Sequence, residues 1–248
     1  MIDSQNKMKK VIFLHHSVGK KIWLGRTNRY IHKLTQKNEI QPFFKKYNKK
    51  NKTRYSITEL TFPKTAPYGW KNYPYDYYNI WVKNAGHAPF NDEPTLEILT
   101  REYDVIIFKH CYPVSNILAD RGIPDIESEE KRLEIYKLQY NALKRKMHEF
   151  PDTKFIIWTP AVFNKNQITE DEAERTYQFY IWIIDEWAEK GDNIFVWDFY
   201  KYETEGGKYL LDEYSIGPFN SHPNRKFSSR VSALFCQFII DVIESVNN

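Results

Sequence analysis

The sequence predicts an α/β fold, a flavodoxin-like three-layer α/β/α arrangement with a five-stranded parallel sheet. Short apolar runs recur along the chain, and segments with helical periodicity separate them. The 248 residues are enough for one domain and too many for a small scaffold that depends on disulfides or metals. Strands that alternate with helices imply right-handed crossovers and a sheet covered on both faces. We therefore expect residues 1–248 to form a single domain.

Five segments have the composition of β-strands. Four of them are continuous apolar runs, which are typical of strands buried on both faces of a parallel sheet. The second segment is mixed, so we expect it near an edge of the sheet. In chain order the segments are 11–14, 55–62, 105–108, 155–158 and 194–197.

Three helices are predicted in the second half of the chain. Helix start signals and apolar residues at steps of three or four predict the first, at residues 124–150. Thr169 and Glu172 have the spacing of a capping box and predict a second helix at 169–191. An amphipathic pattern predicts the last helix at about 226–246.

Composition excludes several classes of protein. Lys and Arg number 36 against 32 Asp and Glu, so the net charge is only +4 and no nucleic-acid partner is expected. The basic run at 45–54 is interpreted as a solvated loop. Cys111 and Cys236 are too few for a secreted disulfide framework, so we expect reduced, partly buried thiols.

The apolar runs are too short for a membrane protein. None approaches the length of a membrane span, so no membrane partner is expected. At the N-terminus the apolar residues 11–14 are followed at once by His15 and His16, which argues against a signal peptide. We therefore expect a cytoplasmic protein, and the sequence leaves its oligomeric state open.

Residues able to do chemistry lie where the strands are predicted to end. Ligands of open α/β sheets bind beyond the carboxyl ends of the strands. Ser17 directly follows the first strand and opens a helix, which suits a nucleophile beside a developing negative charge. His222, just before the last helix, is placed to be its general base, and Asn116, after the third strand, to donate to an oxyanion. Each residue alone has a structural explanation, since such serines are usually N-caps. Their joint placement therefore carries the prediction.

This arrangement resembles the SGNH, or GDSL-like, hydrolase superfamily. Ser17 lies in a His-His-Ser-Val-Gly block at the family's nucleophile position, and Asn116 ends a Tyr-Pro-Val-Ser-Asn block where the family has an asparagine. His222 lies in Ser-His-Pro-Asn, similar to the family's Asp-x-x-His-Pro. The family's glycine after the second strand has Gly69 as its candidate here, with Gly86 as another. The resemblance covers nearly the whole chain in the order of elements. It implies an SGNH-hydrolase-like domain whose oxyanion hole uses Ser17, Asn116 and Gly69, with no cofactor and no metal.

The partner of the histidine departs from the family's pattern. The family's acid usually lies three residues before the histidine, where this chain has Phe219. Asn220 is two residues before, and its amide oxygen can accept a hydrogen bond from the imidazole but cannot stabilise imidazolium as a carboxylate does. Three alternatives remain open. The site works as a Ser-His dyad, another acid such as Asp76 or Asp212 reaches the histidine, or the site is inactive.

Aromatic residues make up 17% of the chain, and they are dense between residues 70 and 81, which we name the aromatic segment. It belongs to an irregular stretch, 62–94, that follows the second strand. Long loops inside compact domains are more often functional than idle. Most of these rings are expected to pack the loop onto the domain. Trp70, Asp76 and Tyr78 are expected to contact substrate, since aromatic faces suit sugar rings.

Two other chemistries are disfavoured by spacing. The block after the first strand superficially resembles a phosphate-binding P-loop, but Leu14 stands where its first glycine belongs and Lys21 where its Ser or Thr belongs. A metal site would require several histidines to gather at the strand ends. None of them has the compact spacing of a metal-binding motif.

The predicted function is a serine-dependent acyl-ester hydrolase. Its substrate is expected to be a small-molecule or saccharide ester, with carbohydrate deacetylation as one form of the reaction. The sequence does not distinguish hydrolysis from acyl transfer to another acceptor. The alternative is a catalytically inactive SGNH-like carbohydrate-binding or interaction protein. A carboxylate within reach of His222 favours the enzyme, and a large separation of Ser17 from His222 favours the binding protein.

Overall fold

The computed structural model describes residues 8–245, and a five-stranded sheet forms its centre. The strand order is β2-β1-β3-β4-β5, and all neighbouring strands are parallel. This confirms the flavodoxin-like fold class, and β2 lies at an edge as its mixed composition predicts. The strands are β1 (Lys9–His15), β2 (Tyr55–Thr61), β3 (Val105–Phe108), β4 (Lys154–Trp158) and β5 (Ile194–Trp197).

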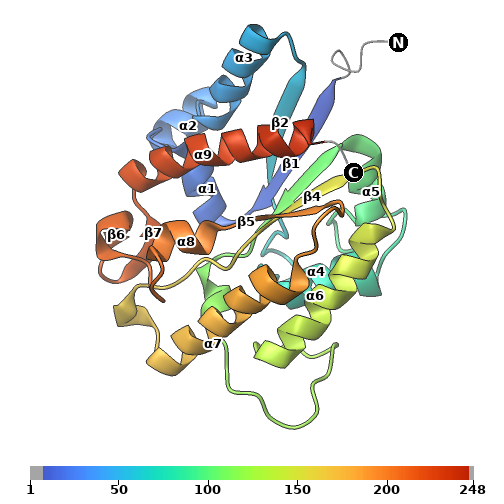
Figure 1. The fold of residues 1–248 in the computed structure, drawn as a ribbon, viewed down its shortest axis with the longest axis vertical. Coiled ribbons are helices and arrows are strands. Elements are labelled where there is room, and N and C mark those ends of the chain that lie inside the picture. The colour runs from blue at the N-terminus through green and yellow to red at the C-terminus, as the bar shows by residue number, and fades with distance from the viewer. Residues whose placement is uncertain (1–7, 246–248) are drawn as a thin grey trace.

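Helices cover both faces of this sheet, which gives three layers (Figure 1). Side chains alternate along β1: Val11 and Phe13 belong to the core on one face, and Ile12 and Leu14 to the core on the other. The first face is covered by α1 (Ser17–Leu24), α3 (Ile40–Asn51), α8 (Phe199–Thr204) and α9 (Arg225–Glu244). The second is covered by α4 (Pro74–Tyr78), α5 (Leu96–Glu102), α6 (Leu133–His148) and α7 (Glu170–Trp182).

Short elements join these layers. A small antiparallel hairpin immediately precedes α9 and lies beside the start of α1. Its strands are β6 (Ser215–Gly217) and β7 (Asn220–Pro223). The other short helices are α2 (Arg29–Thr35), η2 (Asn79–Lys83), η3 (Tyr112–Ser115), η4 (Lys165–Gln167), η5 (Ile183–Trp187) and η6 (Asp212–Tyr214).

The first predicted helix begins later than expected. The structure begins α6 at Leu133, and residues 124–132 are irregular, with a turn at residues 126–127. The carboxylate of Asp125 accepts from the N–H of Glu127 at 2.9 Å, and its carbonyl accepts from the N–H of Ser128 at 3.1 Å. These bonds make a local Asx turn, so the acidic residue read as a helix start closes a turn instead.

The other two predicted helices are confirmed with adjusted ends. Thr169 and Glu172 form both bonds of the capping box, and α7 then continues into the π-helical turn η5. The helix α9 spans 225–244, and its predicted last residue, Val246, lies outside the described residues. Both thiols are free and buried, as expected for reduced cysteines.

Two segments expected to be loops contain helices. The basic run at 45–54 lies largely in α3, which buries Ile40 and Phe44 at a spacing of four and exposes its lysines. The aromatic segment contains all of α4 and part of η2. In both cases tertiary packing of a few apolar side chains outweighs a sequence rich in polar or aromatic residues. Among the described residues, no helix is both long enough and apolar enough to cross a bilayer.

Candidate active site

Three side chains predicted to be catalytic lie in contact at the carboxyl edge of the sheet. Ser17 is the first residue of α1, directly after β1, and His222 and Asn220 lie on β7. The Nε2 atom of His222 is 2.9 Å from Ser17 Oγ. Its Nδ1 atom is 2.7 Å from Asn220 Oδ1. The hydrogen-bond pattern therefore assigns the proton to Nδ1 and leaves the Nε2 lone pair facing the serine hydroxyl.

The hairpin that carries His222 is anchored from both sides. The buried hydroxyl of Ser221 donates to Asn164 Oδ1 at 3.0 Å and accepts from the N–H of Asn164 at 2.9 Å. Asn224, the N-cap of α9, donates to the carbonyls of Glu213 and Ser215. The histidine thus projects from a fixed turn, which matters because base and nucleophile must stay within hydrogen-bond distance.

The ring of His222 also has a fixed aromatic neighbour. Tyr112 stands edge-on to it, with the ring centroids 5.1 Å apart and the planes at 89°. Burial lowers the pKa of His222, and the positive charges of Lys21 and Lys109 lower it further. The imidazole is therefore neutral at pH 7, which is the form that a general base needs.

The first turn of α1 has free backbone donors beside the nucleophile. The N-cap His16 makes no capping hydrogen bond, because its ring turns to the carbonyl of Pro63. The first helical bond of this turn runs from the N–H of Lys20 to the carbonyl of His16. The earlier N–H groups of α1, including that of Ser17, lie outside the helical ladder and can donate to an oxyanion.

Gly19 lets α1 lie close to the strand ends. A Cβ atom at this position would be 2.4 Å from Cβ of His15 and 3.1 Å from Cδ of Lys109. Val18 and Ile22 of the same helix are completely buried in the core. The packing therefore fixes the start of α1, and with it Ser17, against the sheet.

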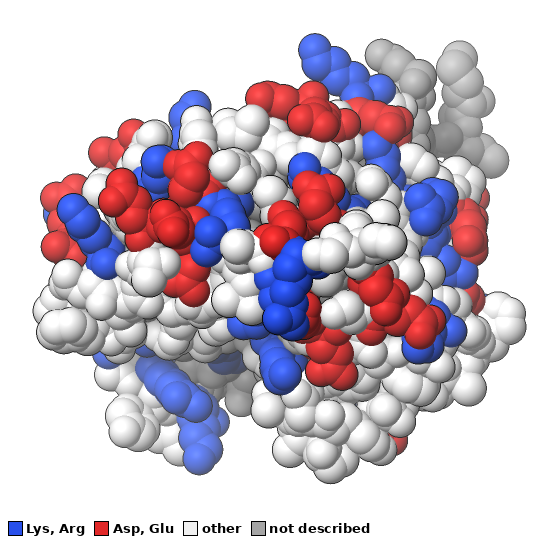
Figure 2. All heavy atoms as spheres, turned by 90° about the horizontal axis from the view of Figure 1, so that it is seen from below, with Lys and Arg blue, Asp and Glu red and all other residues white. Residues whose placement is uncertain are grey.

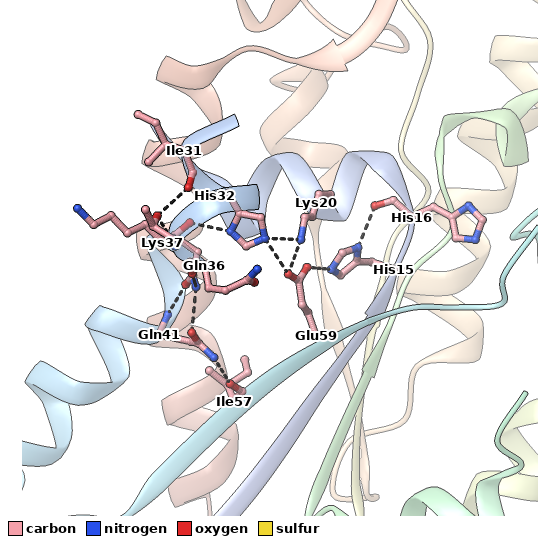
Figure 3. Close-up of polar contacts among 12 residues, drawn as sticks. His15, His16, Lys20, Ile31, His32, Gln36, Lys37, Gln41, Ile57 and Glu59 are labelled. Atoms are coloured by element: carbon pink, nitrogen blue, oxygen red, sulfur yellow. Dashed lines mark hydrogen bonds and ion pairs between the residues drawn. The ribbon is translucent and has the colours of Figure 1, made fainter. Parts of the chain in front are cut away.

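A partly buried polar network includes the two residues before the nucleophile, His15 and His16, and Lys20 after it (Figure 3). Glu59 of β2 contacts Nε2 of His15 at 2.9 Å and forms an ion pair with Lys20. Nδ1 of His15 is 2.9 Å from the carbonyl of His16, and Lys20 also contacts His32 of α2 at 2.9 Å. Burial would raise the pKa of Glu59, but the hydrogen bonds from His15 and Lys20 hold it below its usual value. This network anchors the residue before Ser17 and neutralises the charge of Lys20.

Two residues after β3, Lys109 and Cys111, lie behind the nucleophile, and neither was predicted from the sequence to be part of the esterase site. Sγ of Cys111 is 3.7 Å from Ser17 Oγ, and Nζ of Lys109 is 3.6 Å from Sγ of Cys111. Lys109 is completely buried, and that burial lowers the pKa of its ammonium. Their position directly after a buried strand was the available signal, because strand ends gather at one edge of the sheet.

The residues predicted to complete the oxyanion hole lie elsewhere in this structure. Asn116 directly follows η3, and its amide donates to Oε1 of Glu172 at 3.4 Å. Gly69 has a φ of +77° and its N–H donates to the carbonyl of Thr65. Neither residue lines the pocket that contains Ser17. Their role in the oxyanion hole stays a prediction.

The structure does not support the predicted substrate contacts of the aromatic segment. Trp70 and Tyr78 are each 7% exposed and pack against Phe90 and Tyr75 respectively. Rings buried in this way stabilise the fold and leave no face free for stacking on a sugar. The packing that was expected for most of the segment thus includes these two residues as well.

The carboxylates considered as partners of His222 have other partners. Asp76, predicted to contact substrate, accepts hydrogen bonds from the backbone N–H groups of residues 71–73 and is 3% exposed. Its burial raises its pKa to about 6. Asp212 accepts a hydrogen bond from Asn164 at 3.5 Å. Within residues 8–245, Asn220 is the side chain that contacts Nδ1 of His222.

An open pocket of about 480 Å³ contains the nucleophile. Ser17, Asn220 and His222 all line it, so the three contacting residues face a space that can hold a small ligand. No group of three or more metal-ligating side chains is arranged to hold an ion within the part of the chain that the structure describes. The pocket is lined by His16, Ser17, Lys20, Lys21, Leu24, Arg29, Thr61, Ile216, Asn220 and His222.

Comparison with solved structures gives a weak likeness. No family model and no curated protein matches the chain. One similar solved structure is that of a carbohydrate esterase whose active site displays divergent catalytic and non-catalytic binding functions. The likeness covers 94% of this chain and 69% of that one, with 11% identity and a TM-score of 0.41. A likeness this weak carries no argument, so the function must be inferred from the geometry.

Proposed function

We propose that the protein is a serine-dependent acyl-ester hydrolase of the SGNH type, acting on a small-molecule or saccharide ester. The observation that carries the proposal is the chain of two contacts from Ser17 Oγ to His222 and on to Asn220. A serine, a base in contact with it and a third group that orients the base are the parts of a nucleophilic catalytic site.

In the proposed mechanism, His222 removes the proton of Ser17 as its Oγ attacks the ester carbonyl. The free N–H groups in the first turn of α1 stabilise the tetrahedral oxyanion. The resemblance to the SGNH family predicts Asn116 and Gly69 as further donors, although in this structure each donates to another partner, Glu172 and the carbonyl of Thr65 respectively. His222 then protonates the leaving alcohol and activates the water that hydrolyses the acyl-enzyme.

The presence of Asn220, where a triad has an aspartate, determines the catalytic rate that we expect. Its Oδ1 accepts from Nδ1 of His222 and also from the backbone N–H of His222 at 3.2 Å, so it holds the ring in the useful tautomer. Losing the aspartate of a conventional triad costs about 10⁴-fold in rate, and a wrong tautomer contributes to that loss. Because the tautomer is correct here, we expect a slow enzyme whose deficit is mainly the missing negative charge.

That missing charge also favours a second candidate function. In this candidate the protein is a catalytically inactive SGNH-like carbohydrate-binding or interaction protein. The two candidates differ in the reactivity of Ser17, because binding requires the pocket but not an activated hydroxyl.

Fluorophosphonate labelling followed by peptide mass spectrometry tests the proposal. We expect the native protein to be labelled at Ser17 and the Ser17→Ala and His222→Ala variants to resist labelling. Ser128→Ala, which changes a half-buried serine of the loop before α6, is the matched control and should be labelled as the native protein is. Turnover of p-nitrophenyl esters and acetylated sugars should disappear in the same two variants. A folded native protein that resists labelling and hydrolyses none of these esters would contradict the esterase proposal and favour the second candidate.

A further inference from the structure

The pocket around Ser17 carries positive charge without a carboxylate in its wall. Three of its lining residues are cationic, Lys20, Lys21 and Arg29, and none is acidic. Other parts of the surface carry both signs: Figure 2 shows acidic and basic side chains interspersed over the upper part and centre of the face seen from below. The net charge of +4 therefore does not explain a lining of one sign.

Two of the three cations remain after ion pairing is taken into account. Lys20 is paired with Glu59 in the network that Figure 3 shows. Lys21 and Arg29 take part in none of the ion pairs found among residues 8–245. The positive charge available to a ligand therefore comes from these two side chains.

The position of Lys21 is unfavourable for the isolated protein. Lys21 lies in the last turn of α1, where the helix dipole favours a cation, but it is partly buried beside two further cations, Arg29 and Arg225. Burial lowers the pKa of the Lys21 ammonium, and the neighbouring charges of Arg225 and Arg29 lower it further. Such local conflicts with stability are expected at functional sites, where a ligand supplies the missing counter-charge.

The helix directs this charge to the nucleophile. Ser17, Lys20, Lys21 and Leu24 follow the spacing i, i+3, i+4 and i+7, so they share one face of α1. Residues four apart on a helix have Cβ atoms about 5–6 Å from each other. A group held by Lys21 would therefore lie within a few bonds of a carbonyl that is attacked by Ser17.

We infer that the ester substrate carries an anionic group, a carboxylate or a phosphate, which Lys21 and Arg29 bind beside the scissile bond. This inference rests on the proposed esterase function and adds the charge of its substrate. Lys21 supplies a point charge, while the guanidinium of Arg29 presents a planar fork of donors that matches both kinds of oxyanion.

Matched pairs of esters test the charge preference. One pair is p-nitrophenyl acetate and mono-p-nitrophenyl succinate, which places a carboxylate on the acyl side. Further probes place the charge on the alcohol side: 4-acetoxybenzoate and 4-acetoxyphenyl phosphate, each compared with 4-acetoxybenzamide. We expect at least one anionic ester to exceed its neutral partner about 10-fold in kcat/KM, as hydrogen bonds between charged groups are the stronger class. The carboxylate and phosphate probes identify which oxyanion is preferred.

Variants assign this preference to the two residues. Lys21→Met and Arg29→Gln should each lower the ratio of anionic to neutral kcat/KM about 10-fold, and 0.5 M KCl should lower it in the native protein. The ratio is the readout because loss of Lys21 also alters the pKa of His222. Lys190→Met, at an exposed site between α7 and β5, should leave the ratio unchanged. Equal turnover of every pair would overturn the inference and leave the esterase function intact.

A binding measurement covers the case in which no ester is hydrolysed. The Ser17→Ala variant is titrated with 4-acetamidobenzoate and with the neutral 4-acetamidobenzamide, and saturation-transfer NMR reports binding. We expect tighter binding of the anion, weakened by Lys21→Met. If the anion binds no better than the neutral amide, the inference is wrong whether or not the protein is an enzyme.

Discussion

The aromatic segment and the pocket around Ser17 both follow strand ends of the sheet, but they differ in how much of their side chains is exposed. In the aromatic segment, Trp81 and Tyr77 are completely buried and Asp76 is nearly so. In the pocket, Ser17 and Asn220 are exposed and Lys21 is not neutralised by a carboxylate. A dense set of rings therefore marks a part of the core here, while unsatisfied charge and an exposed hydroxyl mark the proposed site. The comparison predicts that substitutions in the pocket alter chemistry and substitutions in the segment alter stability.

The largest effect should come from His222. His222→Ala removes the proposed general base, and we expect kcat/KM to fall about 10⁴-fold while the free energy of unfolding falls by no more than about 1 kcal/mol, because the lost ring contacts are partly exposed. Ester turnover and urea denaturation of the same preparation measure both quantities. His148→Ala, at a surface histidine paired with Asp192, is the control that should leave both unchanged. A large loss of stability in His222→Ala would assign this residue to the structural region instead.

The opposite outcome is expected in the aromatic segment. Trp81 stacks on Phe62 at 5.3 Å and meets Phe108 edge-on at 5.1 Å. Trp81→Ala should lower the free energy of unfolding by about 3–5 kcal/mol, because it removes a large ring and leaves a cavity. Tyr30→Ala, at a ring that is 79% exposed, should cost less than about 0.5 kcal/mol. Urea denaturation of both variants measures the difference, and equal small losses would show that the segment is not a packed unit.

A buried histidine next to this segment should make stability depend on pH. His110 lies 4.8 Å from the ring of Tyr77, and burial lowers its pKa to about 3. Below pH 6.5 the unfolded chain binds a proton that the folded chain does not, so stability is lost as the pH falls from 6.5 towards 3. From pH 6.5 to pH 5 the loss from this group should be about 2 kcal/mol.

Urea denaturation of native protein and His110→Phe at both pH values measures this loss. The variant should lose about 2 kcal/mol less than the native protein over the same interval. Equal losses in the two proteins would mean that His110 is protonated in the folded state.

The smallest effect should come from restoring a charge to the pocket. Asn220→Asp places a carboxylate beside Nδ1 of His222, which favours imidazolium and should raise the pKa of the histidine by about one unit. We expect kcat to rise about 10-fold on the alkaline side and the acid limb of the pH profile to move upward. Asn220→Gln, which keeps the amide, is the control. An unmoved acid limb would mean that His222 does not control the rate.

The sequence predicts the sheet better than the helices. Continuous apolar runs such as 105–108 and 155–158 match their strands closely, because buried parallel strands have few alternatives in so short a segment. The start of α6 was misplaced because Asp125 forms a local turn, a choice that depends on where the following chain packs. The helix α3 was missed because its lysines outnumber the two buried side chains that hold it.

Some residues of the candidate site could likewise be predicted from the sequence, and others could not. Ser17 and His222 were predictable because strand ends and the start of a helix place them at one edge, whatever the details of packing. Asn220 could be predicted as the partner of His222 only because it is the nearest hydrogen-bond acceptor in the sequence, two residues before the histidine. The burial of Trp70 and Tyr78 was not predictable, since ring content does not distinguish a packed loop from an open platform. The contacts of Lys109 and Cys111 near Ser17 could not be predicted from the sequence, because they depend on how far the end of β3 lies below the surface.

The close approach of Gly19 to the strand ends limits which residues can replace it. Any side chain there collides with His15 or Lys109, so the start of α1 must move and carry the serine hydroxyl away from the imidazole. In a saturation library selected for labelled Ser17, position 19 should therefore tolerate about as few residues as position 17 itself. The reactive centre is in this sense encoded partly by a residue that has no side chain.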